Sequence, residues 1–134
     1  MATGTTPKAV PVACRLFNAM VTRDFDSISV ILASDVRMRV LLPQSIVETN
    51  TAEAAVETFR EWFGAHESCT VIATEQHTVQ RREFLSYNLL VQPDWAPDVF
   101  HIVEQSGYCR VTDDRVTRLD LVCTGYFPTN RDPA

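Results

Sequence analysis

The segment from Val99 to Phe127, near the end of the chain, contains two long runs of β-branched and aromatic residues joined by a short polar turn. Such runs are typical of strands, and Asp113-Asp114-Arg115 interrupts them with residues that tolerate a positive φ or bond to their own backbone. The segment therefore predicts a terminal β-hairpin, and no other feature constrains the fold as strongly.

Length and charge limit the classes of protein to be considered. The chain has 134 residues, of which 46% are hydrophobic, and this suits a single domain with one core. Its net charge is −5, its only lysine is Lys8, and no basic run is longer than Arg81-Arg82. Because nucleic acids and anionic membranes are normally bound by basic stripes, we expect neither as a partner.

The pattern of apolar residues predicts neither a signal peptide nor a membrane-spanning segment. Residues 1–6 are mostly small and polar, and the apolar residues that follow are interrupted by Pro7 and Pro11. The four cysteines are scattered and form no Cys-x-x-Cys pair: Cys14, Cys69, Cys109 and Cys123. We expect a cytoplasmic protein in which these thiols are small apolar core residues.

The first half of the chain predicts three helices. Apolar residues recur at helical spacing between Pro11 and Arg23, and Asp24 can cap a second, shorter helix that stops at Asp35. The strongest helical periodicity runs from Ala52 to Phe63, and Gly64 is expected to end that helix in a left-handed conformation. One broad aromatic face should therefore be buried.

The remaining segments predict strands. The first, 36–42, is followed by a loop over 43–50, and the later runs are 69–79, 83–92, 99–111 and 116–124. Short connections between the later runs imply antiparallel neighbours. We expect an α+β domain over 11–128, in which the three helices pack on the concave face of a curved antiparallel sheet, with disordered tails at 1–10 and 129–134.

Three segments resemble the nuclear-transport-factor-2-like superfamily, and specifically its SnoaL-like branch. They are residues 16–40, the helix at 57–65 and the terminal residues 111–128. The positions that carry the likeness are Asp24, Ile28, Leu32, Asp35, Val36 and the turn Asp113-Asp114-Arg115-Val116, where Asp114 replaces the usual glycine. The closing Cys123-Thr124-Gly125-Tyr126-Phe127 resembles a "CSGF" ending of an uncharacterised bacterial subgroup.

The resemblance implies a cone-shaped domain that encloses an apolar cavity and often forms a homodimer through the outer face of its sheet. Enzymes of the superfamily include polyketide cyclases, a ketosteroid isomerase, a scytalone dehydratase and epoxide hydrolases, all without redox cofactors. Other members only bind ligands or partners. Because the fold supports both, the function depends on particular side chains.

Strand alternation groups His101 and Gln105 on one face together with small apolar residues. This composition suits the lining of a cavity, where His101 could transfer a proton and Gln105 could orient a carbonyl or a water molecule. The opposite parity stays open, because Phe100, Ile102 and Tyr108 could equally face the core.

On the last strand, the resemblance implies that Asp120 and Thr124 face the cavity. Thr124 stands where many relatives have a catalytic aspartate, so Asp120 is the nearest carboxylate that could act as a base. The alternative is an ion pair of Asp120 with Arg118 or Arg110 on a solvated face.

Aromatic and methionine side chains supply the apolar part of the expected substrate-binding site. Trp95 lies on a proline-rich loop and could cover the mouth of the cone. The others are core residues, some of which must line any cavity: Phe17, Met38, Phe59, Trp62, Phe63 and Tyr87.

Metal and other catalytic motifs find little support. Glu75 and His77 share a strand face and could form a metal triad with His101, but Glu-x-His is weak evidence, so we expect no metal and no other cofactor. The isomerase-type base position, in the loop at 41–44, has no carboxylate before Glu48.

These observations predict a cofactor-free acid/base enzyme of the cyclase, dehydratase or isomerase type. His101 and Asp120 would carry protons, and the substrate would be a small apolar metabolite. The alternative is a module that binds a hydrophobic ligand or mediates dimerisation without catalysis. A pocket in which His101 meets a buried carboxylate would favour the enzyme.

Overall fold

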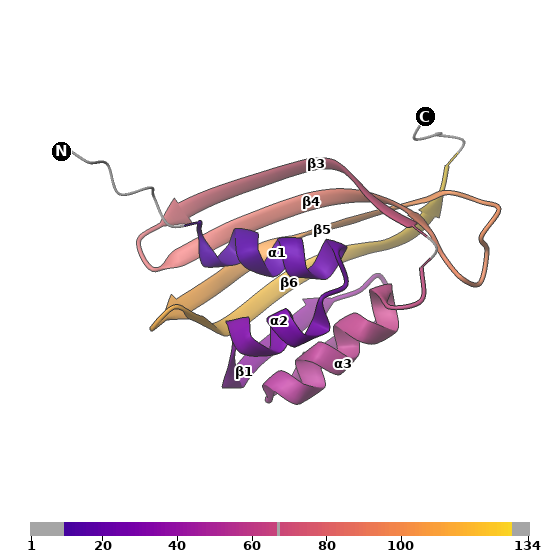
Figure 1. Ribbon diagram of the computed structural model, residues 1–134. Helices are drawn as coiled ribbons and strands as arrows, with labels where there is room; N and C mark the ends of the chain where they lie inside the picture. The colour runs from indigo at the N-terminus through magenta and orange to yellow at the C-terminus, as the bar shows by residue number, and fades with distance from the viewer. Residues whose placement is uncertain (1–9, 67, 130–134) are drawn as a thin grey trace.

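The computed structural model describes residues 10–66 and 68–129, which form three helices and six strands in an α+β arrangement (Figure 1). The residues predicted as tails lie largely outside this part of the chain. The helices are α1 (Val12–Val21), α2 (Phe25–Ile31) and α3 (Ala52–Phe63). The strands are β1 (Leu32–Leu41), β2 (Ile46–Thr49), β3 (Ser68–Val79), β4 (Arg82–Gln92), β5 (His101–Thr112) and β6 (Arg115–Pro128).

The helices begin where the sequence provides side-chain caps. The Asp24 carboxylate accepts a hydrogen bond from the Ser27 N–H at 3.2 Å, and the Thr51 hydroxyl accepts one from the Ala54 N–H at 3.1 Å. The prediction that Gly64 adopts a left-handed conformation is wrong, because its φ is −66° and it continues the right-handed helical conformation. None of the helices in the described segments is long and apolar enough to cross a lipid bilayer.

All six strands form one sheet in the order β2-β1-β6-β5-β4-β3. The four long strands after α3 pair antiparallel, as predicted, whereas β1 pairs parallel to β6. This parallel pair makes the sheet mixed, and it is possible because the long segment between β1 and β6 can return the chain to the same end. The predicted loop at 43–50 contains the short strand β2. This strand was not predicted because it is only four residues long and has no buried residue to mark an inner face.

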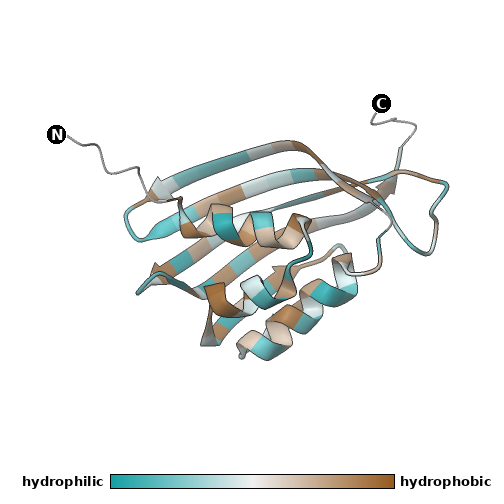
Figure 2. Ribbon diagram, viewed as in Figure 1, coloured by the Kyte–Doolittle hydropathy of each residue, from teal (hydrophilic) through white to brown (hydrophobic). Residues whose placement is uncertain are grey.

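The three helices all lie on one face of the curved sheet, so none of the described helices covers the opposite face (Figure 1). Polar and apolar residues alternate along the strands, as expected for a sheet with one buried side (Figure 2). Val36, Met38 and Val40 of β1 pack with Leu16 and Phe59 in the core between the two layers. The apolar side chains of the helices therefore face the inner side of the sheet.

The terminal hairpin closes through a two-residue turn in which both residues have a positive φ. Asp113 has a φ of 52° and Asp114 a φ of 67°. This conformation is the one expected for a tight hairpin, and an aspartate tolerates it in place of glycine.

Candidate functional site

The inward face of β5 is the one that alternation predicted. His101, Val103, Gln105 and Cys109 are all buried, and Gln105 is only 1% exposed. Burial of Cys109 also raises the pKa of its thiol to about 12, so this cysteine is a core residue as expected. The strand thus delivers a histidine and an amide to the inner side of the sheet.

The predicted orientation of β6 is wrong. Leu119, Leu121 and Cys123 point inward, because Cys109 and Gly107 of the inner face of β5 lie opposite Leu119 and Leu121. Asp120 lies on the outer face, where its carboxylate accepts a hydrogen bond of 2.8 Å from the Arg118 Nε. The ion pair that the sequence left as an alternative is therefore formed, and Asp120 and His101 lie on opposite faces of the sheet.

An irregularity near the end of β6 brings a further residue to the inner face. Cys123 pairs with Gln105 and Tyr126 with Val103, so β6 has one more residue than β5 between these pairs. Gly125 adopts a φ of 80° there, and the Thr124 hydroxyl accepts a hydrogen bond from the Glu104 N–H at 3.0 Å. The Thr124 hydroxyl therefore bonds to the backbone. Tyr126 faces inward, although strict alternation from Leu119 and Leu121 would place it on the outer face.

A pocket of about 320 Å³ opens between the end of α3, the loop after β1 and the inner face of β5 and β6. Most of its wall is apolar. The residues that line it are Leu42, Pro43, Gln44, Ser45, Trp62, Phe63, Val103, Gln105, Cys123, Gly125 and Tyr126. Its volume falls at the lower end of the range for small-molecule sites.

Gln105 is held in the pocket wall by Tyr87. The Tyr87 hydroxyl, which is fully buried, donates a hydrogen bond to the carbonyl oxygen of the Gln105 side chain. Burial raises the pKa of Tyr87 well above its ordinary value, so the hydroxyl keeps its proton. The Gln105 amide nitrogen makes no hydrogen bond to a described residue, which leaves its N–H groups as donors.

A second polar pair lies at Tyr126. Its hydroxyl donates to the Trp62 carbonyl at 2.8 Å and lies 2.9 Å from the Nε2 of His66, which must then be the donor. The Nδ1 of His66 is buried and has no hydrogen-bond partner among the described residues. Burial lowers the pKa of His66 and raises that of Tyr126, so both are neutral at pH 7.

His101 lies beside the pocket rather than in its wall. Its Nδ1 is 2.8 Å from the Val99 carbonyl oxygen, so this nitrogen carries the proton and donates it. The His101 ring forms a three-ring cluster with Trp95 and Tyr126, at centroid distances of 4.9 Å to Trp95 and 6.5 Å to Tyr126, while the Trp95 and Tyr126 centroids are 5.8 Å apart. Trp95 itself is 60% exposed and covers this cluster from the solvent side.

The remaining predicted site residues divide into two groups. Trp62 and Phe63 line the pocket. Phe17, Met38, Phe59 and Tyr87 are buried in the core, where the rings of Phe17 and Tyr87 lie 4.8 Å apart. On α3, sequence patterns alone could not separate the two groups, because the core residue Phe59 and the pocket residues Trp62 and Phe63 belong to the same apolar helical pattern.

The metal triad considered from the sequence is not assembled. Glu75 and His77 are exposed on the outer side of β3, whereas His101 is buried on the inner side of the sheet. A bulge in β3 between Val71 and Ala73 changes which residues of that strand face the core. No group of three or more potential metal ligands occurs within residues 10–66 and 68–129.

Comparison with solved structures finds the same architecture in proteins of low sequence identity. IdmH, a candidate polyketide cyclase from Streptomyces antibioticus, is 10% identical, with a TM-score of 0.70 over 84% of this chain and 88% of its own. An NTF2-like protein of unknown function from Burkholderia pseudomallei is 14% identical, with a TM-score of 0.65 over 82% and 86% of the two chains. The chain has the nuclear-transport-factor-2-like fold.

A third protein with this nuclear-transport-factor-2-like fold is an LEH-like epoxide hydrolase from M. tuberculosis, which is 13% identical, with a TM-score of 0.66 over 84% of this chain and 79% of its own. No family profile matches the sequence, and no curated protein matches it. The fold implied by the resemblance is thereby confirmed. The SnoaL-like branch and the subgroup with the Cys-Thr-Gly-Tyr ending stay predictions.

Proposed function

We propose that the inner pocket binds a small, mainly apolar molecule that carries a carbonyl group. The observation behind this proposal is the Tyr87–Gln105 hydrogen bond, which occupies the amide oxygen and leaves the amide N–H groups of Gln105 as donors in an apolar wall. A buried donor without a partner favours a ligand that supplies an acceptor. The pocket volume of about 320 Å³ suits a molecule of one or two rings.

The test uses a fluorescent aromatic ketone, 6-propionyl-2-dimethylaminonaphthalene, whose emission depends on the polarity and hydrogen bonding at its carbonyl. We expect the wild-type chain to bind it and Gln105→Leu to bind it about tenfold more weakly or worse, because a buried hydrogen bond is lost. Gln76→Leu on β3, away from the pocket, is the matched control and should bind normally. Equal affinity of wild type and Gln105→Leu would refute the proposal.

A second candidate function is a cofactor-free acid/base reaction on the bound molecule, of the cyclase, dehydratase or isomerase type. The observation that favours it is the Tyr126 hydroxyl, which stands in the pocket wall with its proton retained and with His66 beside it. The structural neighbours include proteins described as an epoxide hydrolase and a candidate polyketide cyclase. In this scheme the Tyr126 proton moves from its hydrogen bond with the Trp62 carbonyl to the bound molecule. The N–H at Nε2 of His66 stabilises the phenolate that remains, and His101 positions the Tyr126 ring.

Tyr126→Phe separates catalysis from binding. If Tyr126 is the acid, this variant should still bind the ketone probe but should lose turnover of a compound that the wild type converts, by about a hundredfold or more. Unchanged turnover in Tyr126→Phe would remove Tyr126 from the mechanism. If the wild type binds aromatic ketones and enones but converts none of them, the catalytic function is excluded and only the binding function remains.

We also propose that the chain forms a homodimer through the outer face of the sheet. Three neighbouring apolar side chains support it, because Leu41 pairs with both Ile46 and Val122 and all three are exposed. Such a patch on a sheet face without helices is suited to contact with a second copy.

A further inference from the structure

Four arginines lie side by side across the outer face of the sheet. Arg82 of β4 pairs with Arg110 of β5, Arg110 with Arg118 of β6, and Arg118 with Arg37 of β1. All four are exposed. Because neighbouring strands are about 4.8 Å apart, this arginine row spans about 14 Å.

The charge of the arginine row is compensated only at one position. Asp120 binds Arg118, whereas Arg37, Arg82 and Arg110 form no ion pair with a described residue. Like charges directly opposite each other on a sheet destabilise it. The row holds four of the 12 basic residues of a chain whose net charge is −5, so it is a local concentration of charge and not a reflection of composition.

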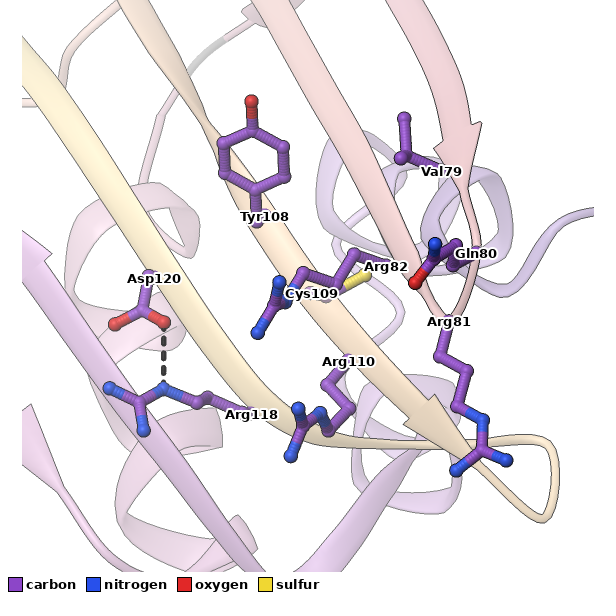
Figure 3. Close-up of a pocket in the computed structure, with 9 residues that line it drawn as sticks. All are labelled: Val79, Gln80, Arg81, Arg82, Tyr108, Cys109, Arg110, Arg118 and Asp120. Carbon is purple, nitrogen blue, oxygen red and sulfur yellow. Dashed lines mark hydrogen bonds and ion pairs between the residues drawn. The ribbon is translucent and has the colours of Figure 1, made fainter.

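A hollow of about 900 Å³ lies over part of this row (Figure 3). The guanidinium groups of Arg82, Arg110 and Arg118 gather on one side of it, and Arg81 extends away from the turn after β3 (Figure 3). Tyr108 also lines the hollow and is 51% exposed, and its ring contacts Phe84 at a centroid distance of 5.3 Å.

We propose that the arginine row binds the phosphate groups of an oligophosphate ligand. A guanidinium presents a planar fork of donors that matches phosphate oxygens, and one phosphate can bridge two adjacent arginines. Phosphate also brings more negative charge per group than a carboxylate. A second copy of the chain fits the row poorly, because a two-fold contact centred there would place arginine against arginine.

The test is calorimetric titration of the full chain with inorganic tripolyphosphate. We expect binding that weakens with added salt, and a loss of about tenfold or more for Arg110→Gln, with a further loss for Arg82→Gln/Arg110→Gln, because each substitution removes charge-assisted hydrogen bonds. Arg60→Gln on α3 changes the net charge equally and should bind as the wild type does. Without ligand, Arg110→Gln should melt no lower than the wild type, since a repulsion is removed.

Two results would overturn the proposal. One is the absence of tripolyphosphate binding by the wild type, which is also the result expected if a second copy covers the row. The other is an equal loss of binding in Arg60→Gln and Arg110→Gln, which would show unspecific attraction.

A further titration with adenosine triphosphate distinguishes two sources of the phosphate chain. Equal affinity for adenosine triphosphate and tripolyphosphate indicates that phosphate alone is recognised. Tighter binding of adenosine triphosphate, lost in Tyr108→Ala, indicates a nucleotide whose base stacks on the exposed Tyr108 ring. Both results keep the arginine row as the phosphate site, and neither depends on the inner pocket, which lies on the other face.

Discussion

The polar residues of the inner face act in pairs, and each pair leaves one group free for a ligand or a proton. The Tyr87 hydroxyl donates a hydrogen bond to the side-chain oxygen of Gln105, and the Tyr126 hydroxyl accepts one from the Nε2 of His66. The free groups are the amide N–H of Gln105 and the buried Nδ1 of His66. Each pair therefore fixes an orientation that a single polar residue in an apolar wall would lack.

His66 makes stability depend on pH. Burial lowers the pKa of His66 in the folded chain, so in mildly acidic solution the unfolded chain binds a proton that the folded chain does not. Stability is then full above the unfolded pKa of about 6.5 and falls as the pH drops below it. We expect urea midpoints to decrease between about pH 7 and pH 5, and to decrease less in His66→Gln.

His77→Gln is the control for this measurement, because His77 is exposed on the outer face. Its pH dependence should match that of the wild type. An identical acid-side decrease in the wild type and in His66→Gln would contradict the assignment.

At the scale of elements, β5 and β6 approach each other closely at Gly107. A Cβ built on Gly107 would lie 1.8 Å from the Asp120 carbonyl oxygen, which no side chain can accommodate without movement of the backbone. The absence of a side chain at Gly107 therefore allows the two strands to approach closely on the inner face. The register that places Cys123 opposite Gln105 continues from this contact.

We expect Gly107→Ala to lose about 2 kcal/mol or more of unfolding free energy, as overpacked core substitutions do. Urea denaturation measures this loss. Ser106→Ala, one residue earlier and on the other face, should change stability by less than about 0.5 kcal/mol. A Gly107→Ala variant as stable as the wild type would show that the strands can separate there at no cost.

Local sequence patterns predicted the elements well and the faces of only some of them. The regular alternation of β5 placed His101 and Gln105 on the inner side, because no bulge interrupts the strand between them. The orientation of β6 was inferred by analogy, and the inward packing of Leu119 and Leu121 decides against it. Tyr126 was missed because the predicted strand stops at Thr124. The irregularity after Cys123 places Tyr126 on the same face as Cys123, and the glycine inside the strand, Gly125, is the available signal for it.

His66 could not be found from the sequence for a different reason. It follows α3 without belonging to a helix or a strand, so no periodicity assigns it a face. The arginine row could not be found from the sequence either, because its four members come from four different strands and no two of them are adjacent in the chain.

At the scale of the whole molecule, the two faces of the sheet carry different kinds of surface. The inner face, covered by helices, holds the pocket (Figure 1). The outer face carries an apolar patch of Ile46, Leu41 and Val122. Four residues away along β1 and β6 lies the end of the arginine row that contains Arg37 and Arg118. Dimerisation on the patch would therefore leave the row at the rim of the contact.

We expect a dimer in solution with twice the 15.1 kDa mass of the chain, and a monomer for Val122→Glu, because a two-fold contact would bring the added charges together. Light scattering coupled to size-exclusion chromatography measures this. Val30→Glu, which changes a valine on α2 that is 66% exposed, against 53% for Val122, should stay dimeric. A monomeric wild type, or a dimeric Val122→Glu, would exclude this interface.

The parallel pairing of β1 with β6 also bears on how the protein is made. During synthesis β1 leaves the ribosome before β2, α3 and β3 to β5, whereas its partner β6 emerges only after all of them. Until then Val36, Met38 and Val40 lack both β6 beside them and most of the sheet that completes the core. The domain therefore cannot complete its core progressively as the chain is synthesised. The nascent chain has an incomplete core until the β5–β6 hairpin has left the ribosome.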